Sequence, residues 1–290
     1  MRDLDQIEDG TVTEIQGQLS KMTATLSKEH ALAHYQMVLG NQYLEMNPLI
    51  GKHIQLSFTG EINCQSCNRL IKKSYSGGFC FPCSQKLAQC DLCIMKPETC
   101  HYDAGTCREP DWAEQFCMQD HFVYLANSAA TKVGITRHTQ IPTRWIDQGA
   151  TQALPIFRVK TRYQSGLVEM IIKAHVSDRT DWRKMLKGQH DEPIDLAAKR
   201  DHLMTKCADE MVALQQRFGS DAIVPLLNEN IIEINYPVQQ YPEKVTSLNF
   251  DKTPVISGIL QGIKGQYLIL DTGVLNIRKF SAYHISVGTE

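Results

Sequence analysis

The sequence contains no apolar run that approaches the length needed to span a lipid bilayer. Its first twenty residues, MRDLDQIEDGTVTEIQGQLS, also lack the basic start and the following apolar stretch of a secretory signal. Internal repeats and low-complexity tracts are not visible either. We therefore expect a soluble, cytoplasmic protein with no membrane partner.

The chain also has little net charge, −2 at pH 7 over 290 residues, but that charge is unevenly distributed. Residues 122–190 contain eleven Lys or Arg against four Asp or Glu, a local charge of +7. The remainder of the chain therefore carries −9. A polyanion such as DNA or RNA should meet this basic segment first.

Cysteine is abundant, and its distribution argues against disulfides. Nine of the ten cysteines lie between positions 64 and 117, mostly in C-x2-C pairs, and no export signal accompanies them. Metal thiolates are the better interpretation. Two of the pairs, Cys64/Cys67 and Cys80/Cys83, are separated by twelve residues, which is zinc-ribbon spacing. We therefore predict one structural zinc at these four cysteines.

A second cluster offers more ligands than one tetrahedral zinc needs, so either one zinc selects four of them or two sites exist. Four thiolates would give a structural zinc, because catalytic zinc keeps one position open for water. Cys207 lies apart from both clusters in the sequence, and we predict that it is a small buried residue. Our preferred ligands are Cys90, Cys93, Cys107 and Cys117, and the competing residues are Cys100, His101 and His121.

Hydrophobic periodicity predicts an α+β fold. Residues 53–62, HIQLSFTGEI, alternate apolar and polar side chains as a half-buried strand does. Residues 255–280 hold short β-rich runs separated by glycines, and the strand at 53–62 could pair with them. Residues 27–43 have a helix-like pattern, and residues 194–218 predict one long helix that Gly219 ends.

The basic segment has its own pattern, in the order strand, strand, helix, strand, helix. The chain then divides into five parts: an N-terminal segment with a strand (1–62), a Cys-rich zinc-binding region (63–120), the β-β-α-β-α core (121–190), a long helix (191–220) and a C-terminal β-rich module (221–290).

Within this core, FVYLANSAATKVGITRHTQIPTRW resembles the opening of the GIY-YIG nuclease superfamily. Val123 and Tyr124 match the end of the first name motif, and Val133 and Gly134 match the end of the second. The resemblance covers about residues 121–187 and is strongest to the phage-associated branch, which reads K-[IV]-G-x-T and continues with a Glu-x5-His helix and an acidic-Trp pair. The corresponding residues are KVGIT, Glu169 with His175, and Asp181 with Trp182. The succession of a zinc ribbon, a second Cys/His cluster and this core is also similar to an uncharacterised bacterial family known only as a domain of unknown function.

The resemblance implies a role for each site residue. Tyr124 would orient the attacking water or accept its proton, Arg144 would hold phosphate oxygens, and Glu169 would bind Mg²⁺. His175 and Trp182 would line the same cleft. The structural alternatives are a packed Tyr124, an Arg144–Asp147 pair and a Glu169–Lys173 pair.

The sequence departs from the superfamily pattern at two positions. Phe122 stands in place of the first Gly, and Lys132 stands in place of the second Tyr, which is implicated in activating water in active members. Lys132 would need a depressed pKa to act as a base, and would otherwise grip phosphate.

Three functions follow from these features. The first is a metal-dependent endonuclease with zinc modules that position DNA or RNA. The second is a nucleic-acid-binding module that has lost cleavage, and the third is a zinc-stabilised protein-interaction scaffold. Phosphate contacts in the second would come from Arg137, Arg144, Arg158, Lys160 and Arg162.

Overall fold

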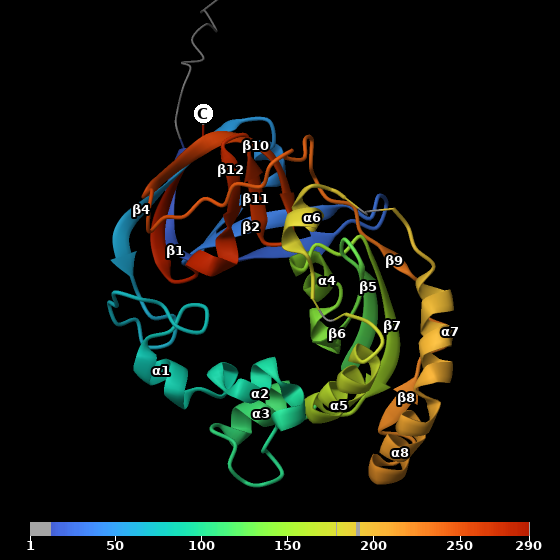
Figure 1. The fold of residues 1–290 in the computed structure, drawn as a ribbon. Helices are drawn as coiled ribbons and strands as arrows, with labels where there is room; N and C mark the ends of the chain where they lie inside the picture. Colours follow the sequence, from blue (N-terminus) through green and yellow to red (C-terminus); the bar gives the residue numbers. More distant parts are fainter. Residues whose placement is uncertain (1–12, 178, 190–191, 290) are drawn as a thin grey trace, which may run out of the picture.

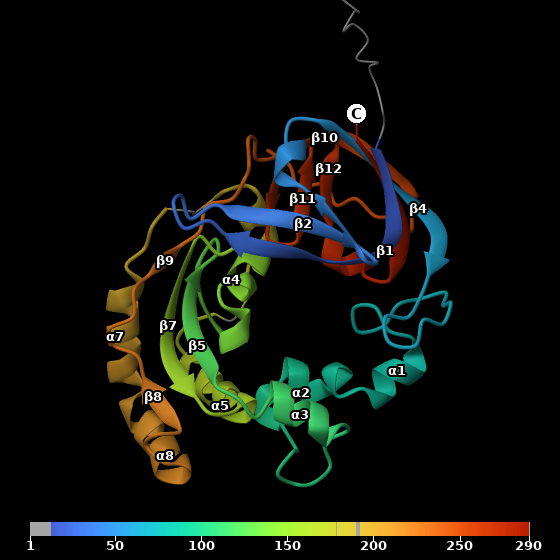
Figure 2. The same cartoon turned by 180° about the vertical axis from the view of Figure 1, so that it is seen from behind.

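The computed structural model describes residues 13–177, 179–189 and 192–289. These residues form a mixed α+β structure with two antiparallel sheets, and a Cys-rich segment connects one sheet to the other. In Figures 1 and 2 the larger sheet, the smaller sheet with its helices, and the Cys-rich segment are arranged around the centre of the molecule. No helix of the described residues is long and apolar enough to cross a membrane.

The larger sheet takes its strands from both ends of the chain. Its order is β12-β11-β10-β4-β13-β1-β2-β3. The expected strand at 53–62 is confirmed as β4, which lies between β10 and β13 and so joins the C-terminal strands. The bounds are β1 (Thr13–Leu26), β2 (Ala33–Leu39), β3 (Gln42–Glu45), β4 (His53–Ile62), β10 (Val255–Lys264), β11 (Tyr267–Leu270), β12 (Gly273–Asn276) and β13 (Tyr283–Thr289).

The helix expected over residues 27–43 is wrong, because the structure forms strands there. In β2 every second residue is buried, namely Ala33, Tyr35, Met37 and Leu39. This period of two is that of a strand with one face on the core. Ala, Met and Gln favour helices, but pairing with β1 on one side and β3 on the other overrides that preference.

The smaller sheet has the order β6-β5-β7-β8, and β9 pairs with β7. Helix α4 lies between β6 and β7 in the chain and α5 follows β7, so the order strand, strand, helix, strand, helix is confirmed. The bounds are β5 (His121–Asn127), β6 (Thr131–Arg137), α4 (Thr143–Asp147), β7 (Gln152–Val159), α5 (Arg162–Lys173), β8 (Ile223–Pro225) and β9 (Ile232–Glu233).

The single long helix expected over residues 194–218 is two helices, α7 (Leu196–Lys206) and α8 (Ala208–Phe218). They meet at the buried Cys207, whose φ of −104° and ψ of 15° leave the helical region. The break lets both helices pack their apolar residues on the smaller sheet. Gly219 ends α8 as expected.

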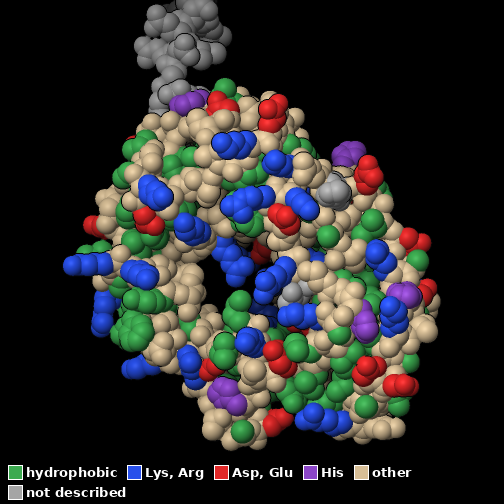
Figure 3. Space-filling model, viewed as in Figure 1, with side chains coloured by type: hydrophobic (Ala, Val, Ile, Leu, Met, Phe, Trp, Pro, Cys, Tyr) green, Lys and Arg blue, Asp and Glu red, His purple; other side chains and the backbone are tan. Residues whose placement is uncertain are grey.

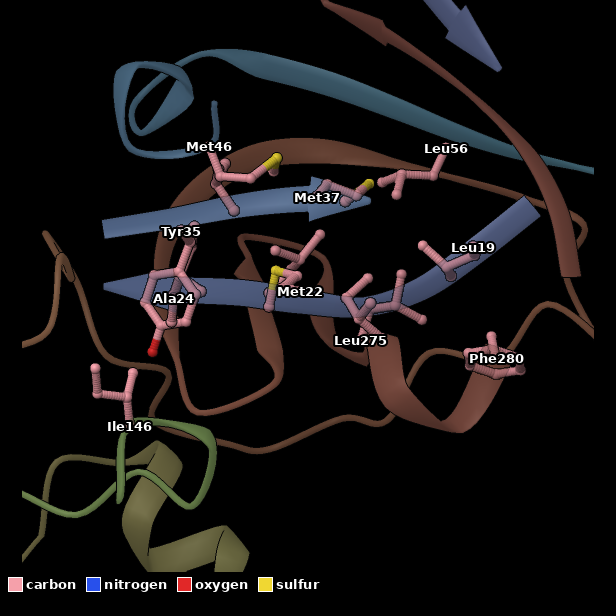
Figure 4. Close-up of a cluster of buried hydrophobic side chains, with 14 of the residues drawn as sticks. Leu19, Met22, Ala24, Tyr35, Met37, Met46, Leu56, Ile146, Leu275 and Phe280 are labelled. Carbon is pink, nitrogen blue, oxygen red and sulfur yellow. The ribbon is translucent and has the colours of Figure 1, made fainter. Parts of the chain in front are cut away.

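One hydrophobic cluster joins the two sheets. Figure 4 shows Ile146 of α4 beside the ring of Tyr35, which belongs to the core of the larger sheet with Met22 and Met37. Tyr124 of the smaller sheet belongs to the same cluster. The larger sheet therefore supports the strands β5 and β7 and the helix α4 of the smaller sheet's region from one side.

Polar contacts strengthen this junction at Asp147, the last residue of α4. Lys21 Nζ lies 2.9 Å from Asp147 Oδ2, and Gln266 Nε2 donates to Asp147 Oδ1 over 2.8 Å. The same Gln266 amide also exchanges two hydrogen bonds with the backbone of Met22. Helix α4 is thus held in place by groups of the larger sheet.

Candidate functional site

The first cysteine cluster has the geometry of a tetrahedral metal site. The four Sγ atoms of Cys64, Cys67, Cys80 and Cys83 all lie within 4.8 Å of one another. Cys67 Sγ and Cys80 Sγ are 3.7 Å apart. Zinc with Zn–S bonds of about 2.3 Å requires sulfur atoms about 3.8 Å apart at the corners of a tetrahedron. These residues therefore fit a zinc ion.

The local backbone explains how the four thiols converge. Gly77 and Gly78 turn the chain with φ of 80° and 134°, in the left-handed region. The φ of Gly78 is one that residues with a Cβ rarely adopt, so this position favours glycine. The turn brings Cys80 back to Cys64, and Cys80 then begins α1 (Phe81–Lys86) as its N-cap.

Backbone N–H groups also favour the thiolate form in this cluster. The amide of Cys80 donates to Cys64 Sγ over 3.2 Å, and the amide of Cys83 donates to Cys80 Sγ over 3.5 Å. Burial raises the pKa of Cys64, but backbone donors from Cys67, Cys80 and Ser66 outweigh it and lower that pKa to about 6. A thiolate is the form that binds zinc.

Four other cysteines surround one small cavity beside α2 (Leu92–Met95) and α3 (Pro110–Phe116). The volume of this cavity is about 20 Å³. The four are Cys93, Cys100, Cys107 and Cys117, and Asp91, His101 and Arg108 also reach the cavity.

Two of the predicted ligands lie elsewhere. Cys90 is not among the residues that line this cavity, and it interacts with Ser76 and Arg108. His121 is fully buried on β5, and its Nδ1 lies 2.7 Å from the carbonyl oxygen of Gln119. Burial lowers the pKa of His121 to about 4, so its ring is neutral at pH 7.

A groove of about 440 Å³ opens between the Cys-rich segment and the smaller sheet. One wall comes from residues 94–98, which run from the end of α2 into the 3-10 helix η3 (Pro97–Thr99), and the other comes from β6, α4 and α5. Figure 3 shows Lys and Arg side chains gathered around an opening in the middle of the molecule. The charged residues of the groove are Lys96, Arg144, Arg162, Lys173 and Arg179, with Glu98 and Glu169.

Beneath the groove, Tyr124 and Lys132 share one acceptor. Tyr124 Oη and Lys132 Nζ both donate to Gln148 Oε1, over 2.8 and 2.7 Å, and Lys132 Nζ also donates to Thr180 Oγ1 over 2.7 Å. Gln148 in turn lines the groove. The two predicted catalytic side chains are therefore connected to the groove through this amide.

Burial governs the ionisation of both side chains. Burial, with repulsion from the charge of Arg144, lowers the pKa of Lys132 to about 7. Burial also raises the pKa of Tyr124, which the charge of Arg144 opposes and that of Glu169 reinforces. Lys132 thus meets the requirement of a depressed pKa, and Tyr124 is a neutral hydrogen-bond donor at pH 7.

Gly134 has a physical reason for its place in the KVGIT motif. It pairs with Tyr124 across β6 and β5, and a Cβ at Gly134 would lie 2.7 Å from Tyr124 Oη. The aromatic ring therefore lies against this glycine, and any side chain there would push the ring away from Gln148. The tyrosine and the glycine of the motif are one packing unit.

The structure brings together some predicted residues and separates others. Arg144, Glu169 and Arg162 line the groove. Asp147, the alternative partner of Arg144, is held by Lys21. His175 is exposed beyond the end of α5 and does not line the groove.

Other predicted residues lie outside the groove. Trp182, the first residue of α6 (Trp182–Leu186), stacks on Tyr267 of the larger sheet at 5.8 Å. Arg158 lies 3.6 Å from Asp120, and Lys160 pairs with Asp221. Arg137 packs over the ring of Phe116, 4.7 Å from its centroid.

Sequence reasoning missed Gln148, Lys96 and Arg179. Gln148 follows Arg144 by four residues at the end of α4, a spacing that places two side chains on one helical face. That spacing was an available signal. Lys96 and Arg179 lie in irregular segments, where no periodicity indicates which way a side chain points.

Comparison with models of known protein families gives a match. A family model described as "Protein of unknown function (DUF2797)" matches residues 51–285. Neither the curated proteins nor the solved structures give a match. The matched span includes both cysteine clusters and every residue of the groove.

Proposed function

We propose that this chain, which belongs to the DUF2797 family of proteins of unknown function, binds nucleic acid in the groove beside Glu169. The observation that carries the proposal is the groove itself, in which five Lys and Arg side chains face two carboxylates. Three of the five are Arg, whose planar guanidinium binds phosphate through two parallel hydrogen bonds. The cations come from four separate segments, an arrangement that suits a polyanion with several phosphates.

The order of the elements supports the same proposal. The strand, strand, helix, strand, helix succession carries Tyr124, Gly134, Arg144 and Glu169 in the places that the resemblance to GIY-YIG nucleases assigns to them. Arg144 and Glu169 face one groove, and Tyr124 reaches it through Gln148. Fold resemblance alone does not establish an activity, so the proposal depends on the groove.

Replacing Arg144 by alanine is expected to weaken binding to labelled DNA or RNA about tenfold and to reduce the slope of log affinity against log salt by about one. The reason is the loss of one phosphate contact and of the counterion release that accompanies it. Fluorescence anisotropy at several salt concentrations measures both quantities.

The matched control is Arg158→Ala, which removes the same guanidinium from an exposed position outside the groove. It should leave affinity and salt slope almost unchanged. Equal losses in the two variants would contradict the groove as the binding site. Absence of salt-dependent binding by the unaltered protein would contradict nucleic acid as the partner.

A second candidate function, cleavage of a phosphodiester in the same groove, is favoured by Glu169. Glu169 lines the same groove as Arg144, Lys173 and Arg179, so a phosphate bound there would lie close to a carboxylate. Glu169 would supply a hard oxygen ligand of the kind that Mg²⁺ takes, usually one or two carboxylates together with substrate phosphate. When bound, such an ion would supply positive charge at the phosphate.

The chain's own residues suit the remaining tasks of hydrolysis. Arg144 would hold the phosphate, and Gln148 would orient a water, with its carbonyl oxygen already fixed by Tyr124 and Lys132. Lys132 does not line the groove, so its role would be to hold the carbonyl oxygen of Gln148, to which its Nζ donates over 2.7 Å. These roles follow from the connection of the buried pair to the groove.

The lowered pKa of the buried Lys132 amine also predicts how the stability of the protein depends on pH. The folded-state pKa of Lys132 lies below its unfolded value, so the unfolded chain binds more protons between about pH 7 and pH 10. Stability should therefore rise with pH across this window. Relative to Lys132→Met, the unaltered protein should gain about 2 kcal/mol between pH 7 and pH 9. Urea unfolding of both proteins at these two pH values measures the difference, and parallel stabilities would show that Lys132 is already charged in the folded protein.

A further inference from the structure

The structure assigns a second metal centre to the cavity lined by Cys93, Cys100, Cys107 and Cys117, which would hold zinc or a similar thiophilic divalent ion in a tetrathiolate site. The cavity volume of about 20 Å³ is the space that one water-sized occupant needs. Four cysteines around such a space match the closed ligand set of a structural zinc. Their sulfur atoms are spaced more widely than those of the first cluster, so binding would draw them inward.

The ligand set differs from the one that C-x2-C spacing predicts. Cys100 takes the place of Cys90, whose neighbours are Ser76 and Arg108. The pair Cys90/Cys93 is thus divided between two environments, because Cys90 ends the 3-10 helix η2 (Ala88–Cys90) and Cys93 lies within α2. Sequence spacing alone cannot show that division.

Asp91 and His101 also reach the cavity and lie within 4.8 Å of Cys93. Both are already engaged. Asp91 caps α2 by accepting from the amide of Cys93, and its carboxylate lies 2.6 Å from Arg108 Nε. His101 has Thr106 at 2.8 Å from Nδ1 and Asp91 at 3.4 Å from Nε2. The thiols are therefore the better ligands.

The surrounding charge fits four thiolates. A zinc ion with four thiolates carries a net charge of −2, which is costly to bury without cations nearby. The backbone amide of Arg162 donates to the carbonyl oxygen of Cys117 over 2.8 Å, and its guanidinium donates to the carbonyl oxygen of Ile94, next to Cys93. Its Nε is buried and, among the described residues, has no hydrogen-bond partner. A buried guanidinium beside the cavity would offset part of the charge of the metal centre.

The proposed centre would also shape the groove, and this part of the inference rests on the proposed function. Residues 94–98, which form one groove wall, lie between the ligands Cys93 and Cys100. The wall packs on α5 at Gly166, where a Cβ would lie 2.6 Å from both Glu98 N and Pro97 Cβ. Arg162 Nη2 donates to Ile94 O over 2.5 Å. A metal ion at the base of this loop would fix the wall against α5.

The zinc content of the purified protein tests whether this second metal centre exists. Protein purified from zinc-supplemented cells should contain about two zinc ions per chain by mass spectrometry of the metal. Cys107→Ser should retain about one, because serine does not replace a zinc thiolate. Cys90→Ser, the matched control outside the cavity, should retain both. Loss of zinc in Cys90→Ser but not in Cys107→Ser would overturn the ligand set.

A second measurement tests the same proposal in case Cys107→Ser fails to fold. Cys64→Ser protein loaded with Co²⁺ should show the intense visible bands of tetrahedral cobalt and the near-ultraviolet charge-transfer band of bound thiolate, both from the second centre. Absence of both bands, with circular dichroism showing the smaller sheet and its helices intact, would overturn the proposal. Neither readout uses nucleic acid, so failure of the proposed function would leave this result unchanged. If the unaltered protein binds nucleic acid, Cys107→Ser should weaken that binding and Cys90→Ser should not.

Discussion

Replacing Cys80 by serine is expected to remove the first zinc and to unfold the segment around residues 63–87. Cys80 connects three parts of the cluster, since its sulfur accepts from Cys83 N, its amide donates to Cys64 Sγ, and it is the N-cap of α1. Structural zinc contributes roughly 10–16 kcal/mol of apparent binding free energy, which is folding free energy for the segment that it organises. The hairpin at Gly77 and Gly78 has no comparable core of its own.

The unfolding should stay local. The larger sheet has an independent hydrophobic cluster, so β4 should remain paired with β10 and β13. Zinc content should fall by about one ion per chain, and limited proteolysis should produce new cuts within 63–87. The control is Cys207→Ser, which removes a buried thiol from the junction of α7 and α8 and should leave zinc unchanged. Full zinc content in Cys80→Ser would contradict the tetrahedral site.

The first cysteine cluster could be predicted from sequence because the information that specifies it is local. Two C-x2-C pairs and a Gly-Gly turn lie within twenty residues, and each pair determines the position of its own thiols through a tight turn. The strand at 53–62 and the strand-helix order of residues 121–190 were predictable for the same reason, since periodicity is a property of neighbouring residues.

The features that local sequence patterns did not predict share a cause of the opposite kind, because they depend on contacts between distant segments. Residues 27–43 form strands because β1 and β3 flank them, and no local preference reveals those partners. Cys90 and Cys100 differ in their distance from the cavity because of how η2, α2 and η3 pack, which spacing does not encode. The wall of the groove at 94–98 comes from a different part of the chain than α5, so its contribution was not predictable either.

The two departures from the nuclease pattern have different consequences in the structure. Phe122 packs beside His138, with ring centroids 5.6 Å apart, and lies outside the groove. Lys132 instead occupies the buried hydrogen-bonded chain with Gln148 and Tyr124. Because its pKa lies at about 7, this lysine is chemically closer to a base than an ordinary lysine or tyrosine. Of the two departures from the nuclease pattern, Lys132 is thus the one that lies in the hydrogen-bonded chain beneath the groove.

If the groove cleaves nucleic acid, Glu169→Gln should separate binding from cleavage. Loss of the carboxylate removes the oxygen ligand proposed for Mg²⁺, and electrostatic stabilisation by a metal ion is worth several kcal/mol, so cleavage should fall on the order of a thousandfold. Affinity should rise slightly, because one negative charge leaves a cationic groove. The two effects have opposite signs, which a general loss of folding cannot produce. Anisotropy in EDTA measures binding, and gel analysis of labelled DNA and RNA with Mg²⁺ or Mn²⁺ measures cleavage.

The matched control is Glu98→Gln, which removes the same charge from the opposite wall of the groove. Both variants should bind with similarly increased affinity, since each makes the groove more positive by one unit. Only Glu169→Gln should lose cleavage if α5 carries the metal ligand, because Glu169 lies on the element that also bears Arg162 and faces Arg144. Equal losses of cleavage would assign the ion to both carboxylates together. Cleavage that survives in Glu169→Gln would contradict the proposed role of Glu169 as a metal ligand. Another outcome is that the unaltered protein binds nucleic acid but cleaves it under none of these conditions. That result would leave the groove as a nucleic-acid-binding surface, in which the buried Lys132–Gln148–Tyr124 chain serves only to hold α4 in place.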